Sequence, residues 1–213
     1  MKIALFGATG HIGQSILDEA LSRGYEVVAV VRDPSRLAQR TDKLKVVTGD
    51  VAQPASWLEA VRGVDAVVAS LSARRDGNPD SVPANALVLL DNLPKAGVKR
   101  LLWVGGAASL EVAPGVRVID DPNFPPAWKP EAVAQSTALE VFRASKTDVD
   151  WTYISPAALL QDGERTGKYR VGGDQLLVDA KGESRISVAD YAVALLDRVE
   201  QHDALRQRIT VAY

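Results

Sequence analysis

Three glycines at regular spacing lie near the start of the chain. Gly7, Gly10 and Gly13 follow an apolar run, Lys2–Phe6, and precede a stretch with helical periodicity. In a strand, turn and helix unit, the first glycine permits a tight turn, the second lets a ligand approach the backbone, and the third lets the helix pack closely. The unpaired N–H groups and the positive dipole end of such a helix favour phosphate. A glycine-rich turn that binds nothing is the alternative, but the order of the elements favours a dinucleotide cradle, formed by Gly7, Thr9, Gly10, His11, Ile12 and Gly13.

The residues after the second predicted strand bear on the choice of nucleotide. Arg32 comes first, directly after Glu26–Val31, with Asp33 next and Arg36 one turn further on. In a doubly wound sheet, a carboxylate here hydrogen-bonds the ribose hydroxyls of NAD, whereas an arginine pairs with the 2′-phosphate of NADP. Two arginines beside Ser35 suit a phosphate. We therefore expect NADP(H) to be preferred over NAD(H), while Asp33 leaves NAD open and the arginines could simply be solvated.

Other cofactor contacts are expected where later strands end. Asp50 and Val51 follow the third predicted strand and suit the adenine edge, although an aspartate that only begins a turn is an alternative. Ligands of open α/β sheets bind outside the carboxyl ends of the strands. We therefore also expect the cofactor to contact residues that follow the fourth, fifth and sixth strands, namely Ser70, Leu71, Gly105 and Pro156.

Length and composition narrow the class of protein. The 213 residues suffice for one substantial core, and the net charge of −2, from 25 basic and 27 acidic residues, gives no footprint for nucleic acid or anionic membrane. The absence of cysteine excludes disulfides, thiolate metal sites and a cysteine nucleophile. Two separated histidines, His11 and His202, make a metal site improbable. We expect a soluble cytoplasmic protein, monomeric or homodimeric, without a nucleic-acid or membrane partner.

Alternation of apolar runs with helical patterns predicts the fold. Expected strands cover 2–6, 26–31, 44–48, 65–69, 100–104 and 150–154, and expected helices cover 13–23, 54–61, 84–96, 131–145 and 187–200. This rhythm indicates parallel βαβ units with right-handed crossovers. The fold class is therefore α/β, a doubly wound and mostly parallel Rossmann sheet in a single domain, residues 1–213.

The expected connections are less regular. Residues 70–83 are polar and predict a loop, and the prolines of 110–130 argue against regular structure there and against a helix at Lys129. Beyond residue 155, short strands are expected at 169–171, 176–178 and 185–187, followed by a final edge strand at 208–213. Residues 155–213 would form a small lobe over the ligand crevice.

The chain resembles the atypical short-chain dehydrogenase/reductases. The glycine turn, residues 7–13, and the segment 31–37 are similar to the NmrA-like branch that includes biliverdin-IXβ/flavin reductases. The segments 151–156, 163–170 and 186–192 resemble small bacterial NADH-flavin reductases. The resemblance covers nearly the whole chain and implies the fold and a nicotinamide cofactor. It says little about substrate, because the branch holds both reductases and binding-only sensors.

The chain lacks the catalytic residues that are typical of that superfamily. The resemblance implies a serine after the fifth strand and a Tyr-x-x-x-Lys on the next helix, but no tyrosine here is followed four residues later by lysine. Gly105 and Gly106 stand at the serine position, with Ser109 three residues further on. We take Ser109 as the candidate catalytic hydrogen-bond donor, although a turn or capping role is the alternative.

Hydride transfer to a planar acceptor needs mainly positioning and a dry slot. Phe124 and Trp128 are expected to wall that slot, although Trp128 could instead anchor its loop. The expected function is an NADPH-dependent oxidoreductase acting on a flavin, a quinone or a similar small planar molecule. A non-catalytic NADP(H)-binding redox sensor is the alternative, and a nucleotide-sugar epimerase or dehydratase suffers most from the missing tyrosine.

Overall fold

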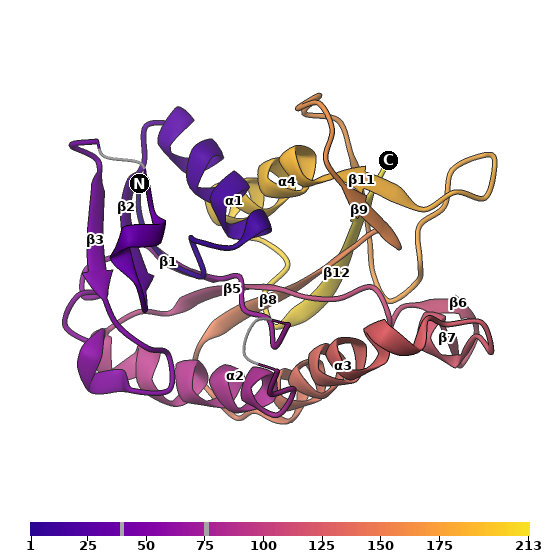
Figure 1. Cartoon of the computed structure of the whole chain (residues 1–213), viewed down its shortest axis with the longest axis horizontal. Coiled ribbons are helices and arrows are strands. Elements are labelled where there is room, and N and C mark those ends of the chain that lie inside the picture. The colour runs from indigo at the N-terminus through magenta and orange to yellow at the C-terminus, as the bar shows by residue number, and fades with distance from the viewer. Residues whose placement is uncertain (39–40, 75–76) are drawn as a thin grey trace.

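A mostly parallel sheet is the centre of the molecule, as predicted. The computed structural model describes residues 1–38, 41–74 and 77–213. The sheet strands are β1 (Lys2–Phe6), β2 (Glu26–Val31), β3 (Leu44–Thr48), β4 (Ala66–Ala69), β5 (Arg100–Val104), β8 (Asp150–Pro156), β10 (Arg170–Gly172) and β12 (Gln207–Ala212). Within these described residues they form eight strands in the order β10-β12-β8-β5-β4-β1-β2-β3 (Figure 1). All neighbours pair in parallel except β10 with β12.

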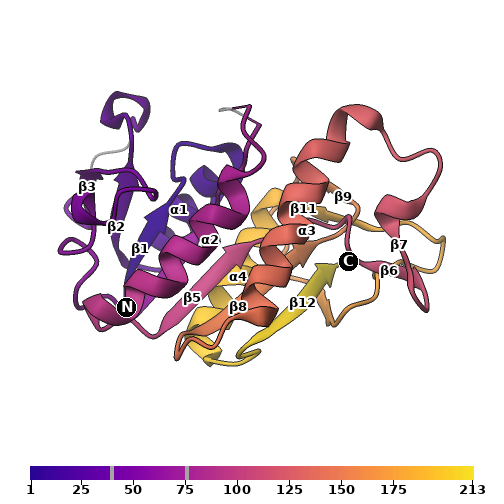
Figure 2. The same ribbon diagram turned by 90° about the horizontal axis from the view of Figure 1, so that it is seen from below.

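Two pairs of helices cover the two faces of this sheet. The helices are α1 (His11–Ser22), α2 (Ser81–Asn92), α3 (Lys129–Ala144) and α4 (Val188–Gln201). Helices α1 and α4 pack together on one face, and α2 and α3 pack together on the other (Figures 1 and 2). In the part of the chain that the structure describes, no helix is both long and apolar enough to cross a bilayer.

The core lies in two layers, one on each face of the sheet. Leu5, Ile16 and Leu195 belong to the layer beneath α1 and α4 and are fully buried. The opposite layer contains an aromatic cluster, in which the ring centroids of Trp103 and Phe142 lie 5.3 Å apart with the edge of one ring toward the face of the other. Because both faces are covered, β4 and β5 are buried along their whole length, which explains their continuous apolar sequences.

The sheet reverses its direction of winding between β1 and β4. The chain moves from β1 outward to β2 and β3, then returns to place β4 on the other side of β1. At such a switch point the connections leave toward opposite faces and open a crevice outside the carboxyl ends of the strands. The fold therefore places the glycine turn after β1 beside the loop after β4.

The last strand is not the edge strand that the sequence suggested. β12 lies between β8 and β10, and the edge position belongs to the short antiparallel strand β10. Five of the six residues of β12 are buried, as expected of an internal strand. Local sequence could not show this, because β10, which pairs with the outer side of β12, lies about forty residues earlier in the chain.

Several short elements also differ from expectation. Only Pro54–Ser56 forms a 3₁₀ turn where a helix was predicted over 54–61, because the Ser56 hydroxyl donates to the Gln53 carbonyl and accepts from the Asp50 N–H. Residues 176–178 form no strand, whereas β9 (Leu159–Gln161) was not expected and pairs with β11 (Arg185–Ser187). The proline-rich stretch contains a small hairpin of β6 (Glu111–Ala113) and β7 (Val116–Arg117).

Two helices begin earlier than predicted because proline is tolerated in a first turn. Helix α2 starts at Ser81 and contains Pro83, and α3 starts at Lys129 and contains Pro130. The missing proline N–H has no helical partner at these positions in any case. The loop expected over 70–83 is therefore shorter, and its residues 75–76 lie outside the described part of the chain.

Candidate functional site

The glycine turn has the geometry that its spacing predicted. Gly7 has a φ of +85°, and a Cβ added there would lie 2.0 Å from the Ser70 carbonyl oxygen. A Cβ on Gly13 would lie 2.0 Å from the Gly7 carbonyl oxygen, so this glycine lets α1 pack against the turn. Gly10 has extended backbone angles, and the nearest atom to its notional Cβ is 3.3 Å away. The first and third glycines are thus required by the fold, whereas the second is bounded by the Gly7 carbonyl oxygen alone and is open on its other sides.

The first helix offers an uncapped amino end to that space. Gly10 is the N-cap residue of α1 and, having no side chain, supplies no side-chain cap to the first turn. Early N–H groups of a helix have no intrahelical partner and carry a partial positive charge. This end of α1 is therefore suited to an anion such as a pyrophosphate.

A cavity of about 1020 Å³ opens at the carboxyl ends of the strands and contains the glycine turn. Such a volume lies at the upper end of small-molecule pockets, which leaves room for a dinucleotide and a second molecule. Twelve of the fourteen predicted cofactor residues line it, as do both predicted substrate residues. They are Gly7, Thr9, Gly10, His11, Ile12, Arg32, Asp50, Val51, Ser70, Leu71, Gly105 and Pro156, with Phe124 and Trp128.

Three predicted site residues are not brought to the cavity wall. Gly13 is buried beneath the turn and has a packing role. Arg36 is exposed on the 3₁₀ turn Pro34–Arg36 that follows β2 and does not line the cavity. Ser109 lies beyond the lining residues 105–108, and its hydroxyl accepts a hydrogen bond from Arg208 at 3.3 Å. Ser109 therefore lies just outside the cavity lining, and its role as a catalytic hydrogen-bond donor stays a prediction.

The two candidates for nucleotide discrimination have different environments. Arg32 is exposed and lines the cavity where β2 ends. The carboxylate of Asp33 turns back on its own loop and accepts from the Ser35 N–H at 3.0 Å and the Ser35 hydroxyl at 2.6 Å. These hydrogen bonds lower the pKa of Asp33. Asp33 is therefore engaged as the cap of a turn and does not face the cavity.

Asp50 combines the two roles considered for it. Its carboxylate accepts from the Ala52 N–H at 2.9 Å, which is the turn-forming role, and it also lines the cavity beside Val51. Val51 is buried and accepts a hydrogen bond on its carbonyl from the indole of Trp57. This anchored loop forms the cavity wall next to the end of β2.

The inner wall of the cavity is a network that sequence reasoning missed. Gln135 on α3 donates to the Leu71 carbonyl at 2.9 Å and accepts from the Trp103 indole N–H at 3.1 Å. It also donates to Glu131 at 3.1 Å, and the other Glu131 oxygen accepts from the Ala73 N–H at 2.9 Å. Both side chains line the cavity and lie four residues apart on the helix after β5. The sequence signal that could have found them is the four-residue spacing of Glu131 and Gln135, which matches that of a Tyr-x-x-x-Lys on the same helix.

Tyr153 lies behind this wall and is not an accessible acid. Its ring occupies the space in which a Cβ of Gly105 would stand, 2.0 Å from a ring carbon. Its hydroxyl donates to the Gln135 carbonyl at 2.9 Å and accepts from the Gly106 N–H at 3.1 Å. Burial raises the pKa of this fully buried phenol well above its usual value. The Tyr153 ring therefore leaves no room for a side chain at position 105.

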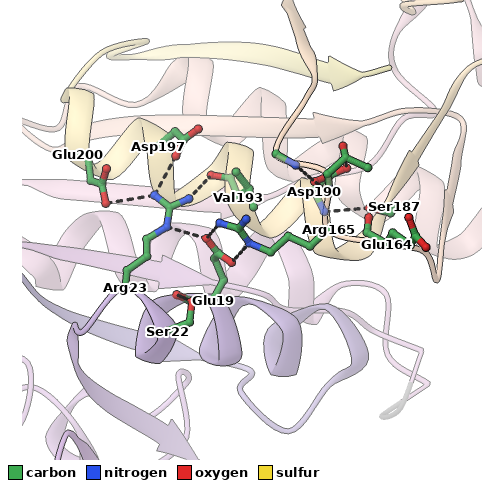
Figure 3. Close-up of polar contacts among 12 residues, drawn as sticks. Glu19, Ser22, Arg23, Glu164, Arg165, Ser187, Asp190, Val193, Asp197 and Glu200 are labelled. Carbon is green, nitrogen blue, oxygen red and sulfur yellow. Dashed lines mark hydrogen bonds and ion pairs between the residues drawn. The ribbon is translucent and has the colours of Figure 1, made fainter.

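Residues 157–160 form the outer wall of the cavity, and the loop after β9 connects this wall to α1 and α4 by hydrogen bonds. Residues 157–160 line the cavity, and the following loop sends Arg165 to Glu19 on α1, with N–O distances of 2.6 and 2.8 Å (Figure 3). The same Glu19 accepts from Arg23 at 2.7 Å. Hydrogen bonds from Arg165 lower the pKa of Glu19, against the opposing effect of burial.

Asp190, in the first turn of α4, fixes the same loop. Its carboxylate accepts from the Thr166 N–H and hydroxyl, the Gly167 N–H and the Tyr213 hydroxyl, at 2.6 to 2.8 Å. The two segments singled out by resemblance, 163–170 and 186–192, therefore meet here as a structural joint. Asp190 lies in the first turn of α4, where a carboxylate favours the helix dipole, and its carboxylate is directed to the loop.

Fold and cradle together define an NAD(P)H-binding Rossmann protein, and comparison with known proteins agrees. Residues 7–198 match the model of a family described as NAD(P)H-binding. The chain belongs to this NAD(P)H-binding, oxidoreductase-like family, and its resemblance to the NADH-flavin reductase branch is confirmed.

Three relatives align with this chain over nearly the whole length of both proteins. The uncharacterised protein YwnB of Bacillus subtilis is 39% identical over 214 residues, covering 99% of this chain and 98% of YwnB. A Burkholderia pseudomallei structure, provisionally named an exported protein, is 43% identical with a TM-score of 0.89 and full coverage of both chains. A Streptococcus pneumoniae structure, provisionally named an NADH-flavin reductase, is 32% identical with a TM-score of 0.83, covering 100% of this chain and 99% of that one. The expected cytoplasmic location stays a prediction.

Proposed function

We propose that the protein is an NADPH-dependent oxidoreductase that reduces a small planar acceptor, such as a flavin or quinone. The observation that carries this proposal is the inner wall, where Gln135, Glu131 and Tyr153 make hydrogen bonds within the protein. Among the described residues, Tyr153 is the tyrosine at this wall, and it is buried. A developing alkoxide needs a proton donor, whereas a conjugated ring can take a hydride and receive its proton from water.

The residues present fit the cofactor. The open space at Gly10 and the uncapped end of α1 suit the pyrophosphate, and Arg32 suits a 2′-phosphate. When bound, a reduced nicotinamide supplies the hydride. The chain's own part is to hold the rings face to face, with Phe124 and Trp128 walling the acceptor and the segment 157–160 closing the outer side.

We expect Arg32→Ala to remove most of a preference for NADPH over NADH. A charge-assisted hydrogen bond to the 2′-phosphate contributes about 1.5–3 kcal/mol, so the NADPH affinity should fall about ten- to hundredfold while the NADH affinity changes little. Nucleotide fluorescence titration measures both. Arg36→Ala is the matched control, since Arg36 does not line the cavity, and equal wild-type affinities for the two nucleotides would contradict the assignment.

The reaction itself is tested by following NADPH consumption with two classes of acceptor. We expect oxidation with flavins and quinones and none with simple aldehydes or ketones, because Tyr153, the tyrosine at the inner wall, is buried and donates its hydroxyl proton to the Gln135 carbonyl. Tyr153→Phe should leave the flavin rate within a few-fold, because the phenol is buried behind the wall and its hydrogen bonds to Gln135 and Gly106 are structural. Rapid ketone reduction would disprove the proposal, and tight NADPH binding without any turnover would favour the redox sensor.

A further inference from the structure

Glu131 brings a carboxylate to the acceptor end of the cavity. It lies in the first turn of α3 and lines the cavity together with Phe124 and Trp128. Its two oxygens accept from the Ala73 N–H and from Gln135, which fixes the group at the junction of α3 and the loop after β4. A carboxylate has about four lone-pair positions, so acceptor capacity remains after these two hydrogen bonds.

Among the described residues, no basic side chain forms an ion pair with Glu131, which lies in the first turn of α3. Both of its partners in the described part of the chain are N–H groups of uncharged residues. Arg74 and Asp121 also line this end of the cavity, but both are exposed and have opposite signs. The negative charge in the half-buried wall is therefore that of Glu131.

The other end of the cavity has the opposite character. Arg32 and the positive end of α1 lie there, beside His11. Asp50 also lines this end, but its carboxylate accepts from the Ala52 N–H, so Arg32 and the helix end favour an anionic group there. Glu131 disfavours one at the acceptor end. This polarity separates the phosphates of a cofactor from the ring of an acceptor.

Resting on the proposed function, we propose that Glu131 makes the acceptor subsite selective for uncharged planar acceptors that carry a ring N–H or O–H. The carboxylate accepts a hydrogen bond from such a donor and repels an anionic group carried on a side chain of the same acceptor. Like-charge repulsion across the partly dehydrated slot should weaken binding about ten- to hundredfold. Riboflavin should therefore bind in preference to FMN, which has the same ring system and an added phosphate.

The test compares two flavins in one binding assay. Quenching of flavin fluorescence gives the affinities of riboflavin and FMN in the presence of saturating NADP⁺. We expect the wild type to bind riboflavin at least about tenfold more tightly, and Glu131→Gln to bring this ratio close to one. Glu131→Asp keeps the charge and should keep the preference, which separates charge from loss of a hydrogen bond.

Glu140→Gln is the matched control. Glu140 lies on the same helix, is exposed, and pairs with Arg143 at 3.1 Å outside the cavity, so its loss should leave the ratio unchanged. The inference is overturned if FMN binds as well as riboflavin, if Glu131→Gln keeps the preference, if that variant weakens both flavins equally, or if neither flavin binds. Failure of the reductase proposal is distinguishable, because it would give the expected binding ratio with no NADPH oxidation.

Discussion

Replacing Gly10 by valine is expected to abolish dinucleotide binding while the protein stays folded. The backbone at Gly10, with φ −86° and ψ 164°, lies in a region that valine adopts readily. The side chain would enter the space above α1 that a pyrophosphate needs, and a loss of about a hundredfold or more in affinity should follow. Poorer capping should cost about 1 kcal/mol in stability. Calorimetric titration with NADPH, with circular dichroism beside it, measures both effects.

Gly13→Ala provides the contrast within the same turn. Its Cβ would stand 2.0 Å from the Gly7 carbonyl oxygen, and backbone on both sides of the contact must move. We expect a loss of about 1–3 kcal/mol or more in the free energy of unfolding. Unchanged NADPH affinity in folded Gly10→Val would show that the pyrophosphate binds elsewhere.

Asp190→Ala is expected to be strongly destabilising although it lies outside the cavity. The residue is fully buried, and its loss leaves the Thr166 and Gly167 N–H groups and the Tyr213 hydroxyl without their acceptor. Each such group costs about 1–3 kcal/mol when unsatisfied, so a total of about 3–5 kcal/mol is reasonable after partial hydration. Urea unfolding measures this, with the exposed Asp91→Ala as a control that should stay within about 0.5 kcal/mol.

The effect of Asp190→Ala should also depend on pH. Burial alone would raise the pKa of Asp190, but the hydrogen bonds from Thr166, Tyr213 and Gly167 outweigh it and lower the pKa below the usual 3.8. A carboxylate with a depressed folded pKa stabilises the protein above its unfolded pKa, and this stabilisation is lost as pH falls through the folded pKa. The stability gap between wild type and variant should therefore narrow between neutral pH and about pH 3. A gap that widens on acidification would show that Asp190 is held protonated.

Local sequence determined the parallel strands of the sheet and the glycine turn after β1. Continuous apolar strands, the spacing of Gly7, Gly10 and Gly13, and the position of Arg32 after β2 are short-range features whose geometry follows from backbone sterics. They predicted the order of the elements and twelve residues that line the cavity. They did so because parallel strands must present their carboxyl ends at one edge.

Only the tertiary structure decided which side chains line the end of the cavity that we assign to an acceptor. Ser109 was predicted from its distance along the chain, but a turn after Ala108 directs it to Arg208. Glu131 and Gln135 become wall residues because α3 packs beside the loop after β4, and Asp190 becomes a joint because the 163–170 loop returns to α4. These contacts join residues from 23 to 99 positions apart. Local propensity and spacing do not encode such pairings, since they depend on how whole elements pack.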